Sequence, residues 1–300
     1  MAYSIYKSGF KSYLQLEKGL SANTLEAYLL DVKKLFDFLT ENKGSKDIRK
    51  VTLEDLAEFI SSINKSGLSA YTQARIISGT RTFFKYLMLE EIIDKDPSEL
   101  LDSPQLGRKL PEVLNIDDIS RLIGSIDLSQ PEGERNKAIM ETLYGCGLRV
   151  SELINLRISD LHFKEGMISV TGKGNKQRLV PIGMTAIRQI NIYRQQVRIH
   201  LIPQKGCEDV LFLNRRGAKL SRQMIFLMIR KQAEICGIRK KISPHTFRHS
   251  FATHLVQNGA DLRAVQELLG HVSINTTEIY THLDSDDLRR AILKFHPRNR

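Results

Sequence analysis

The segment SPHTFRHSFATHL, residues 243–255, holds one arginine and three histidines directly after a proline. At about 100° per residue on a helix, His245, Arg248 and His249 fall on one face, and the two phenylalanines fall on another. A guanidinium between two imidazoles would repel a bound cation, and HTFRH lacks the glutamate of the HExxH zinc motif. The segment therefore favours an anionic ligand over a metal. We interpret His249 and His254 as core-facing or supporting histidines with satisfied nitrogens rather than as reactive groups.

A second arginine, Arg149, stands at the start of an expected helix in GLRVSELINL, and Glu152 follows three residues later. Helix N-termini attract anions, so an arginine at this position can share a phosphate with the helix end. Glu152 would then hold the guanidinium from behind. A surface salt bridge between the two residues is the alternative interpretation.

The segment MISVTGKGNKQRLVPIG, residues 167–183, predicts a β-hairpin, because two β-type runs flank the turn signal GKGNK. Lys173 lies at its tip between two glycines, with Lys176 and Arg178 close by. The tip is not a P-loop, since GxxxxGK[ST] is absent. We expect a finger that delivers Lys173 to nucleic acid while Lys176 and Arg178 contact the same DNA. A solvated basic turn is the alternative.

The last cluster of reactive types is ELLGHVSINTTEIYTH. Gly270 is expected to end a helix and to leave His271 in an ordered turn. Asn275 is expected to cap the following helix, which puts Tyr280 in its second turn. A tyrosine there usually packs with its hydroxyl at the rim of the core. Here, however, the tyrosine has unusual company, since it follows the other clusters of reactive residue types.

The elements that must position these residues are mainly helices. Apolar residues recur at helical spacing through the first hundred residues, with Asn23 and Thr52 as expected N-caps. Three prolines within residues 97–111 prevent a continuous helix and predict a linker. The chain after the linker is again mainly helical, with the hairpin as its exception. We therefore expect a mainly α fold with a small β-hairpin or sheet and two domains, 1–107 and 108–300.

The charge is concentrated in the second domain. Residues 1–107 carry 14 Lys and Arg against 15 Asp and Glu, whereas residues 108–300 carry 31 against 19. The total of +11 indicates a polyanionic partner, with nucleic acid favoured over a membrane surface. In the first domain, Arg81 and Lys85 share the polar face of one helix. That face is either a strip for DNA phosphates or simply solvated.

Cysteine usage and hydropathy indicate the compartment. Three widely spaced cysteines without a CxxC argue against a disulfide framework and a zinc cluster. The N-terminus does not resemble a signal peptide, and no apolar run has membrane-spanning length. We expect a cytoplasmic protein without a membrane partner.

The motifs GLRVSEL, TGKGNKQRLVPI, SPHTFRHSFATHL, LLGH and TTEIYTH, in this order and spacing, resemble those of Xer-type tyrosine recombinases. The match spans essentially the whole chain. It implies a helical, SAM-like core-binding domain over 1–107, with no arm-binding domain before it. It also implies a catalytic domain over 108–300 that ends in an exchange tail at about 284–300. By motif position, the family's active site maps onto Arg149, Lys173, His245, Arg248, His271 and Tyr280.

The resemblance implies that Tyr280 is the nucleophile and that cleavage leaves a 3′-phosphotyrosyl bond and a free 5′-hydroxyl. Phosphoryl transfer builds charge on two non-bridging oxygens, which Arg149 and Arg248 can bind in a planar, bidentate way. Energy is kept in the covalent bond, so we expect no metal, no ATP and no other cofactor.

The remaining groups complete the implied chemistry. His245 is expected to assist loss of the tyrosyl proton, and His271 to hydrogen-bond the phosphate. Lys173 is expected to protonate the 5′-oxygen of the leaving group.

The resemblance further implies a double-stranded recombination site as substrate, a Holliday junction as intermediate, and a homotetramer or a heterotetramer with a related recombinase. The helix expected at 284–295, apolar on one face, would dock on a neighbouring protomer, and packing on its own domain is the alternative. The implied role is chromosome-dimer resolution and segregation, with a DNA translocase as a candidate activator. Alternatives are the integrase of a mobile element, a type IB topoisomerase, a DNA-binding protein without catalysis, and a metalloenzyme.

Overall fold

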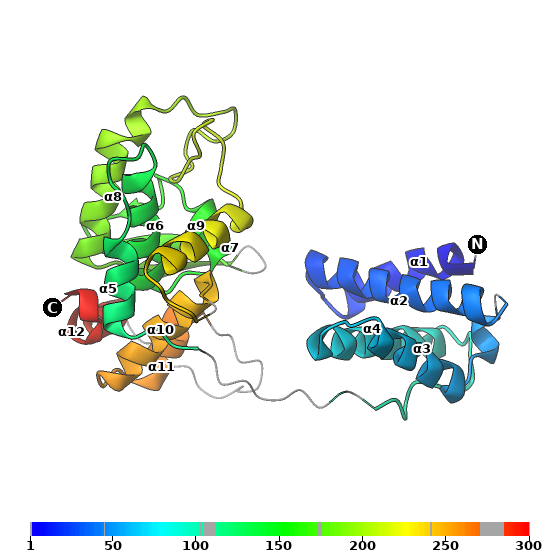
Figure 1. Ribbon diagram of the computed structural model, residues 1–300. Coiled ribbons are helices and arrows are strands. Elements are labelled where there is room, and N and C mark those ends of the chain that lie inside the picture. The colour runs from blue at the N-terminus through cyan, green and yellow to red at the C-terminus, as the bar shows by residue number, and fades with distance from the viewer. Residues whose placement is uncertain are drawn as a thin grey trace. The chain divides into compact units, whose positions relative to one another are not determined.

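The computed structural model describes residues 2–44, 46–102, 104, 112–172, 176–240, 242–270 and 285–299. The chain divides into two compact units, Met1–Lys109 and Leu110–Arg300, and each unit has its own apolar core. The described residues are mostly helical and form one small sheet (Figure 1). The expected mainly α fold is confirmed.

The first unit is built from helices alone among its described residues. These are α1 (Ala2–Ser12), a π-helical turn η1 (Tyr13–Glu17), α2 (Ala22–Asn42), a 3-10 turn η2 (Ile48–Lys50), α3 (Leu53–Lys65) and α4 (Ala70–Leu89).

Local sequence determines where two of these helices begin. Thr52 caps α3, and its hydroxyl and the Asp55 carboxylate form the two halves of a capping box. The expectation that Asn23 caps α2 is wrong, because the helix already begins at Ala22 and the Ser21 hydroxyl accepts from the backbone N–H of Thr24 at 3.4 Å. Serine and asparagine are similarly good N-caps, so the sequence alone does not decide which of Ser21 and Asn23 caps the helix.

The second unit combines helices with a small three-stranded sheet. Its elements are α5 (Ile116–Gly124), α6 (Gly133–Cys146), α7 (Val150–Asn155), β1 (Leu161–His162), β2 (Met167–Thr171), β3 (Gln177–Pro181), α8 (Met184–Gln196), a 3-10 turn η4 (Arg198–His200), α9 (Arg222–Ile235), α10 (Pro244–Gln257), α11 (Leu262–Leu269), α12 (Ser285–Phe295) and a 3-10 turn η5 (Pro297–Asn299). The helices α7 and α12 contact the sheet.

The expected hairpin is confirmed as the antiparallel pair β2–β3, in which Ile168 faces Val180 and Val170 faces Arg178. Strand β1 pairs with the other edge of β2, and the sequence pattern did not indicate it. The tip, residues 173–175, lies outside the described residues.

Helix α10 runs through the core of the second unit and packs against α6, α9, α11 and α12 (Figure 1). Phe247, Phe251 and Leu255 are fully buried, as their spacing predicts. His254 is also buried, and its Nδ1 lies 2.8 Å from the hydroxyl of Tyr144 on α6. It is therefore a core-facing histidine with a hydrogen-bonded ring nitrogen, as the sequence indicated.

The C-terminal helix α12 packs on its own unit. Leu288, Ala291 and Ile292 are buried in the core. The side-chain amide of Asn258 donates to the backbone carbonyl of Phe295 at 2.7 Å, and so ties α12 to the end of α10. In the single chain this apolar face is therefore buried on its own domain, and docking on a neighbouring protomer stays a prediction for the assembly.

Candidate active site

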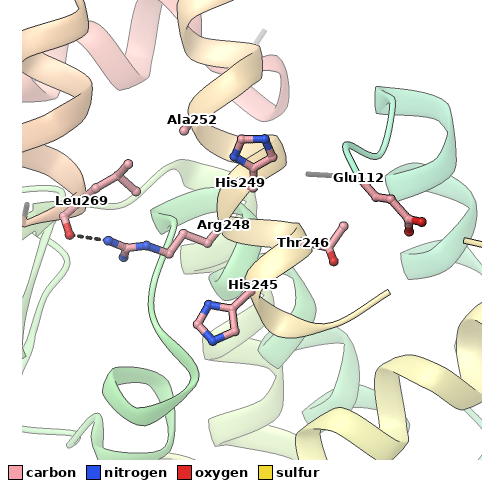
Figure 2. A pocket seen from close by; sticks show the side chains of 7 residues that line it. All are labelled: Glu112, His245, Thr246, Arg248, His249, Ala252 and Leu269. Carbon is pink, nitrogen blue, oxygen red and sulfur yellow. Dashed lines mark hydrogen bonds between the residues drawn. The ribbon is translucent and has the colours of Figure 1, made fainter. Parts of the chain in front are cut away.

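The N-terminus of α10 positions one set of candidate residues. Ser243 caps the helix together with Thr246, and Pro244 occupies its first position, as expected. An open pocket of about 360 Å³ lies along this end of the helix. Figure 2 shows its lining, which consists of Glu112, His245, Thr246, Arg248, His249, Ala252 and Leu269. His245 is exposed in this pocket, whereas Arg248 is only 7% exposed.

A glycine turn brings Arg149 toward α10. Gly147 ends α6 in the left-handed region, with φ of 59°. A Cβ at this residue would lie 2.5 Å from Cδ1 of Phe251, so the position requires glycine sterically as well as conformationally. The Gly147 carbonyl accepts a 2.7 Å hydrogen bond from Nη1 of Arg248. Gly145, two residues earlier, lies inside α6.

Arg149 is the N-cap residue of α7 and is held by Glu152 through two contacts. Its backbone N–H donates to Oε2 at 2.8 Å, and its Nη1 donates to Oε1 at 2.9 Å. Glu152 is 3% exposed, so this is not the surface salt bridge of the alternative interpretation. The carboxylate sits behind the guanidinium, and the Arg149 side chain remains 33% exposed.

Two further arginines reach the same carboxylate. Arg178 on β3 donates to both Glu152 oxygens, at 2.7 and 3.1 Å, and Nη1 of Arg248 lies 3.9 Å from Oε2. We call Arg149, Glu152, Arg178 and Arg248 the Glu152 cluster. Burial alone would raise the pKa of Glu152, but hydrogen bonds from Arg178 and from the Arg149 backbone outweigh it and lower the pKa. Glu152 is therefore ionised at neutral pH.

The cluster is also tied to the end of α11. Arg248 donates from Nη2 to the carbonyl of Leu269, the contact drawn in Figure 2. Arg149 donates from Nη2 to the carbonyl of Gly270 at 3.4 Å. Gly270 adopts the left-handed C-cap conformation and ends α11, as expected. Both arginines thus contact the residues that immediately precede His271.

Burial and neighbouring charge act on Arg248 together. Desolvation, followed by repulsion from Arg149 and Arg178, lowers its pKa to about 10. The guanidinium remains protonated at neutral pH. Three guanidinium groups around one carboxylate leave two positive charges in excess, so the cluster is electrostatically prepared for an anion.

The other candidate residues are distributed as follows. Lys173, His271 and Tyr280 lie outside the described residues. Lys176 is exposed beside the hairpin tip, and His249 is half-buried in the pocket of Figure 2.

In the first unit, Lys85 is exposed on α4. Arg81 is half-buried, and its Nη2 donates to the backbone carbonyl of Leu101. Arg81 therefore holds the C-terminal end of its own unit, a contact that the polar face of the helix did not indicate.

Within the described ranges, no group of three His, Cys, Asp or Glu side chains is arranged to hold a metal ion. Over the same ranges, none of the helices is long and apolar enough to cross a membrane.

The chain is similar in sequence to known protein families and to individual known proteins. The Phage integrase family matches residues 112–286, and the N-terminal SAM-like domain of phage integrases matches residues 8–91. The tyrosine recombinase XerD of Listeria monocytogenes serotype 4b (strain F2365) is 43% identical over 289 residues, covering 96% of this chain and 97% of that protein. XerD of Staphylococcus aureus (strain Mu50 / ATCC 700699) is 44% identical over 286 residues, covering 95% and 96%.

Solved structures show the same likeness. The XerH site-specific recombinase bound to its difH substrate, a pre-cleavage complex, is 27% identical with a TM-score of 0.68, over 89% of this chain and 78% of that chain. A lambda integrase (75–356) dimer bound to a COC′ core site is 16% identical with a TM-score of 0.70, over 93% and 98%, and indicates the fold alone.

Proposed function

The chain belongs to the phage integrase family, whose XerD members are tyrosine recombinases, and on that premise we propose that it cuts and rejoins DNA at a specific site through Tyr280. It is an enzyme that cleaves and rejoins DNA strands. The substrate is a double-stranded recombination site, and the reaction passes through a 3′-phosphotyrosyl bond and a Holliday junction.

The observation that carries this proposal is the Glu152 cluster. Arg149 from α7 and Arg248 from α10 converge on one buried carboxylate, beside the pocket that holds His245. A scissile phosphodiester carries one negative charge, and more charge develops on its non-bridging oxygens during attack. The cluster has two positive charges in excess, on planar guanidinium groups. These charges can stabilise the negative charge that develops on the phosphate oxygens without a metal ion.

The proposed roles follow from the chemistry of the groups. The Tyr280 hydroxyl attacks phosphorus and the bond to the 5′-oxygen breaks, so the phosphodiester is exchanged for a phosphotyrosyl ester of similar energy. Lys173 supplies the proton to the 5′-oxygen, and His245 assists removal of the tyrosyl proton. His271 hydrogen-bonds the phosphate. Its place directly after Gly270, whose carbonyl Arg149 contacts, supports that role.

The DNA contacts complete the proposed site. Lys176 and Lys85, both exposed, are proposed to contact DNA phosphates, and Arg81 is proposed to contribute near Lys85. Residues 1–107 form the core-binding domain, and 108–300 form the catalytic domain with its tail at about 284–300. The match of the SAM-like family to residues 8–91 supports this division.

The cellular role that these relatives favour is chromosome-dimer resolution and segregation in the cytoplasm. Identities of 43% and 44% to XerD proteins, over nearly the whole of both chains, favour that role over a mobile-element integrase or a topoisomerase. The active assembly is proposed to be a tetramer on two paired sites, homomeric or shared with a related recombinase. A DNA translocase is the proposed activator.

Covalent trapping tests the proposal. The purified chain is incubated with host genomic DNA in buffer containing a chelator, and denatured samples are assayed for protein–DNA adducts. The wild type is expected to form adducts at a discrete site, and Tyr280→Phe to form none while its DNA affinity stays unchanged. Tyr71→Phe, at an exposed tyrosine of the first unit, is the matched control and should form adducts normally. Adducts in Tyr280→Phe would place the nucleophile elsewhere.

A further inference from the structure

Arg178 lies where the hairpin meets both α7 and the end of α11. Its two terminal nitrogens donate to the two oxygens of Glu152, at 2.7 and 3.1 Å. A Cβ at Gly270 would lie 3.1 Å from its Nε, so the guanidinium fills the space beside the last residue of α11. One side chain thus connects β3, α7 and α11.

This geometry differs from that of a phosphate-contacting arginine. The fork of Arg178 is already occupied by a buried carboxylate, and its side chain is only 19% exposed. Its Nε is buried and has no hydrogen-bond partner among the described residues, so it does not face solvent either. Arg248 also has both terminal nitrogens engaged, but by the neutral carbonyls of Gly147 and Leu269. Both terminal nitrogens of Arg178 instead donate to one carboxylate, so the charge of Arg178 is already paired.

We propose that Arg178 is a positioning residue that satisfies Glu152, so that Arg149 and Arg248 keep their remaining N–H donors for the scissile phosphate. Among the described residues, Arg178 is the only one whose guanidinium donates to both Glu152 oxygens. Without it, an ionised and buried Glu152 would draw in the nearest remaining cations. Arg149 already contacts Oε1, and Arg248 is 3.9 Å from Oε2. Each guanidinium captured in this way would be lost to the phosphate.

Arg178 also fixes the base of the hairpin. It pairs with Val170 across the sheet, and the backbone N–H of Gly172 donates to the carbonyl of Lys176 at 2.8 Å. A Cβ at Gly172 would lie 3.4 Å from Nη1 of Arg178 and 3.8 Å from Oε1 of Glu152. The residue preceding Lys173 therefore lies against the Glu152 cluster, next to Arg178.

This inference rests on the proposed function, and a double-mutant cycle tests it on the full chain. Single-turnover adduct formation and DNA affinity at several salt concentrations are measured for the wild type, Arg178→Ala, Glu152→Gln and the double variant. Arg178→Ala is expected to cleave at least about tenfold more slowly with unchanged affinity. The double variant is expected to recover at least about tenfold relative to additivity, because the neutral amide of Glu152→Gln no longer captures Arg149 and Arg248.

Lys176→Ala is the matched control on the same hairpin. Its exposed ammonium should act as a phosphate contact, so its loss should weaken DNA binding and reduce the salt slope by about one. The same behaviour from Arg178→Ala, with no rescue by Glu152→Gln, would overturn the positioning role and make Arg178 a DNA contact.

Two further outcomes are distinguished, a variant that does not fold and a wild-type chain that forms no adducts. If Arg178→Ala does not fold, as judged by circular dichroism, the cycle is repeated with Arg178→Met, which keeps much of the volume and removes the charge. Additive effects in that cycle would refute the inference. A wild-type chain that forms no adducts would instead refute the proposed function, which separates the two failures.

Discussion

Nη1 of Arg248 donates a 2.7 Å hydrogen bond to the carbonyl of Gly147, the left-handed residue that ends α6. The two residues are 101 positions apart in the chain. The contact joins the turn that precedes Arg149 to the helix that carries Arg248, and it is the means by which the two proposed phosphate-binding arginines are brought together.

Gly147→Ala is expected to lower the free energy of unfolding by about 2–4 kcal/mol, because a left-handed alanine is strained and its Cβ would meet Phe251 at 2.5 Å. Urea unfolding measures the change. Gly237→Ala is the matched control, since Gly237 has φ of 65° with open space around it. Gly237→Ala should lower the free energy of unfolding only by the strain of a left-handed alanine, about 1 kcal/mol. Equal decreases in the unfolding free energy of the two variants would show that the Phe251 ring moves aside without a loss of stability.

Arg149→Lys is expected to slow adduct formation by about 10²–10³-fold, because one ammonium cannot replace a planar fork on the phosphate. The fold should be retained, since Glu152 keeps both hydrogen bonds from Arg178. Single-turnover cleavage and a thermal melt measure the two effects. A normal cleavage rate would remove Arg149 from the proposed site.

Lys173→Ala is expected to cleave ordinary DNA slowly but to be largely rescued by a substrate with sulfur at the 5′-bridging position. A thiolate leaves without a proton, so a missing general acid no longer matters. The ratio of cleavage rates on the two substrates is the measurement. An equal defect on both substrates would assign Lys173 a positioning role.

Ile292→Ala is expected to destabilise the chain by about 2–4 kcal/mol, because its side chain is 1% exposed in the core of the second unit. Leu293→Ala, at a neighbour that is 46% exposed on the same helix, is the matched control and should cost much less. Urea unfolding without DNA distinguishes them. Similar small losses would mean that α12 does not dock on its own unit in solution.

His296 makes the stability of the second unit depend on pH. Burial, with His254 and Arg298 nearby, lowers its pKa to about 4, whereas an unfolded chain titrates near its ordinary value of 6.5. The neutral imidazole is the native form, so its contribution is complete above about pH 6.5 and is lost as pH falls toward 4. At pH 5 the loss is about 2 kcal/mol.

His296→Phe, which cannot titrate, should show a smaller drop in unfolding free energy between pH 8 and pH 5 than the wild type. Urea unfolding at both pH values provides the comparison. Identical drops in the two proteins would contradict the assignment of this pH dependence to His296.

Much of this molecule follows from its sequence by itself. Thr52 and Ser243 cap their helices, Gly270 ends α11, and the two β-type runs pair around GKGNK, because each depends on residues only a few positions apart. The apolar face of α10 is equally readable from its helical spacing. The sequence also contains a signal that Arg178 points inward. It stands two residues before the buried Val180, and residues two apart lie on the same face of a strand.

The tertiary structure alone decided which partners those residues meet. Glu152 accepts hydrogen bonds from Arg178, which is 26 residues away in the chain. Arg81 donates to the backbone carbonyl of Leu101, although the sequence placed it on an exposed polar face. The helix α12 has an apolar face that any complementary surface could bury, so periodicity could not say whether its own domain or a neighbour would do so. A sequence pattern specifies which face of an element is apolar or charged. Which surface that face contacts depends on chain segments far apart in sequence, and only the packing of the whole domain sets their distances.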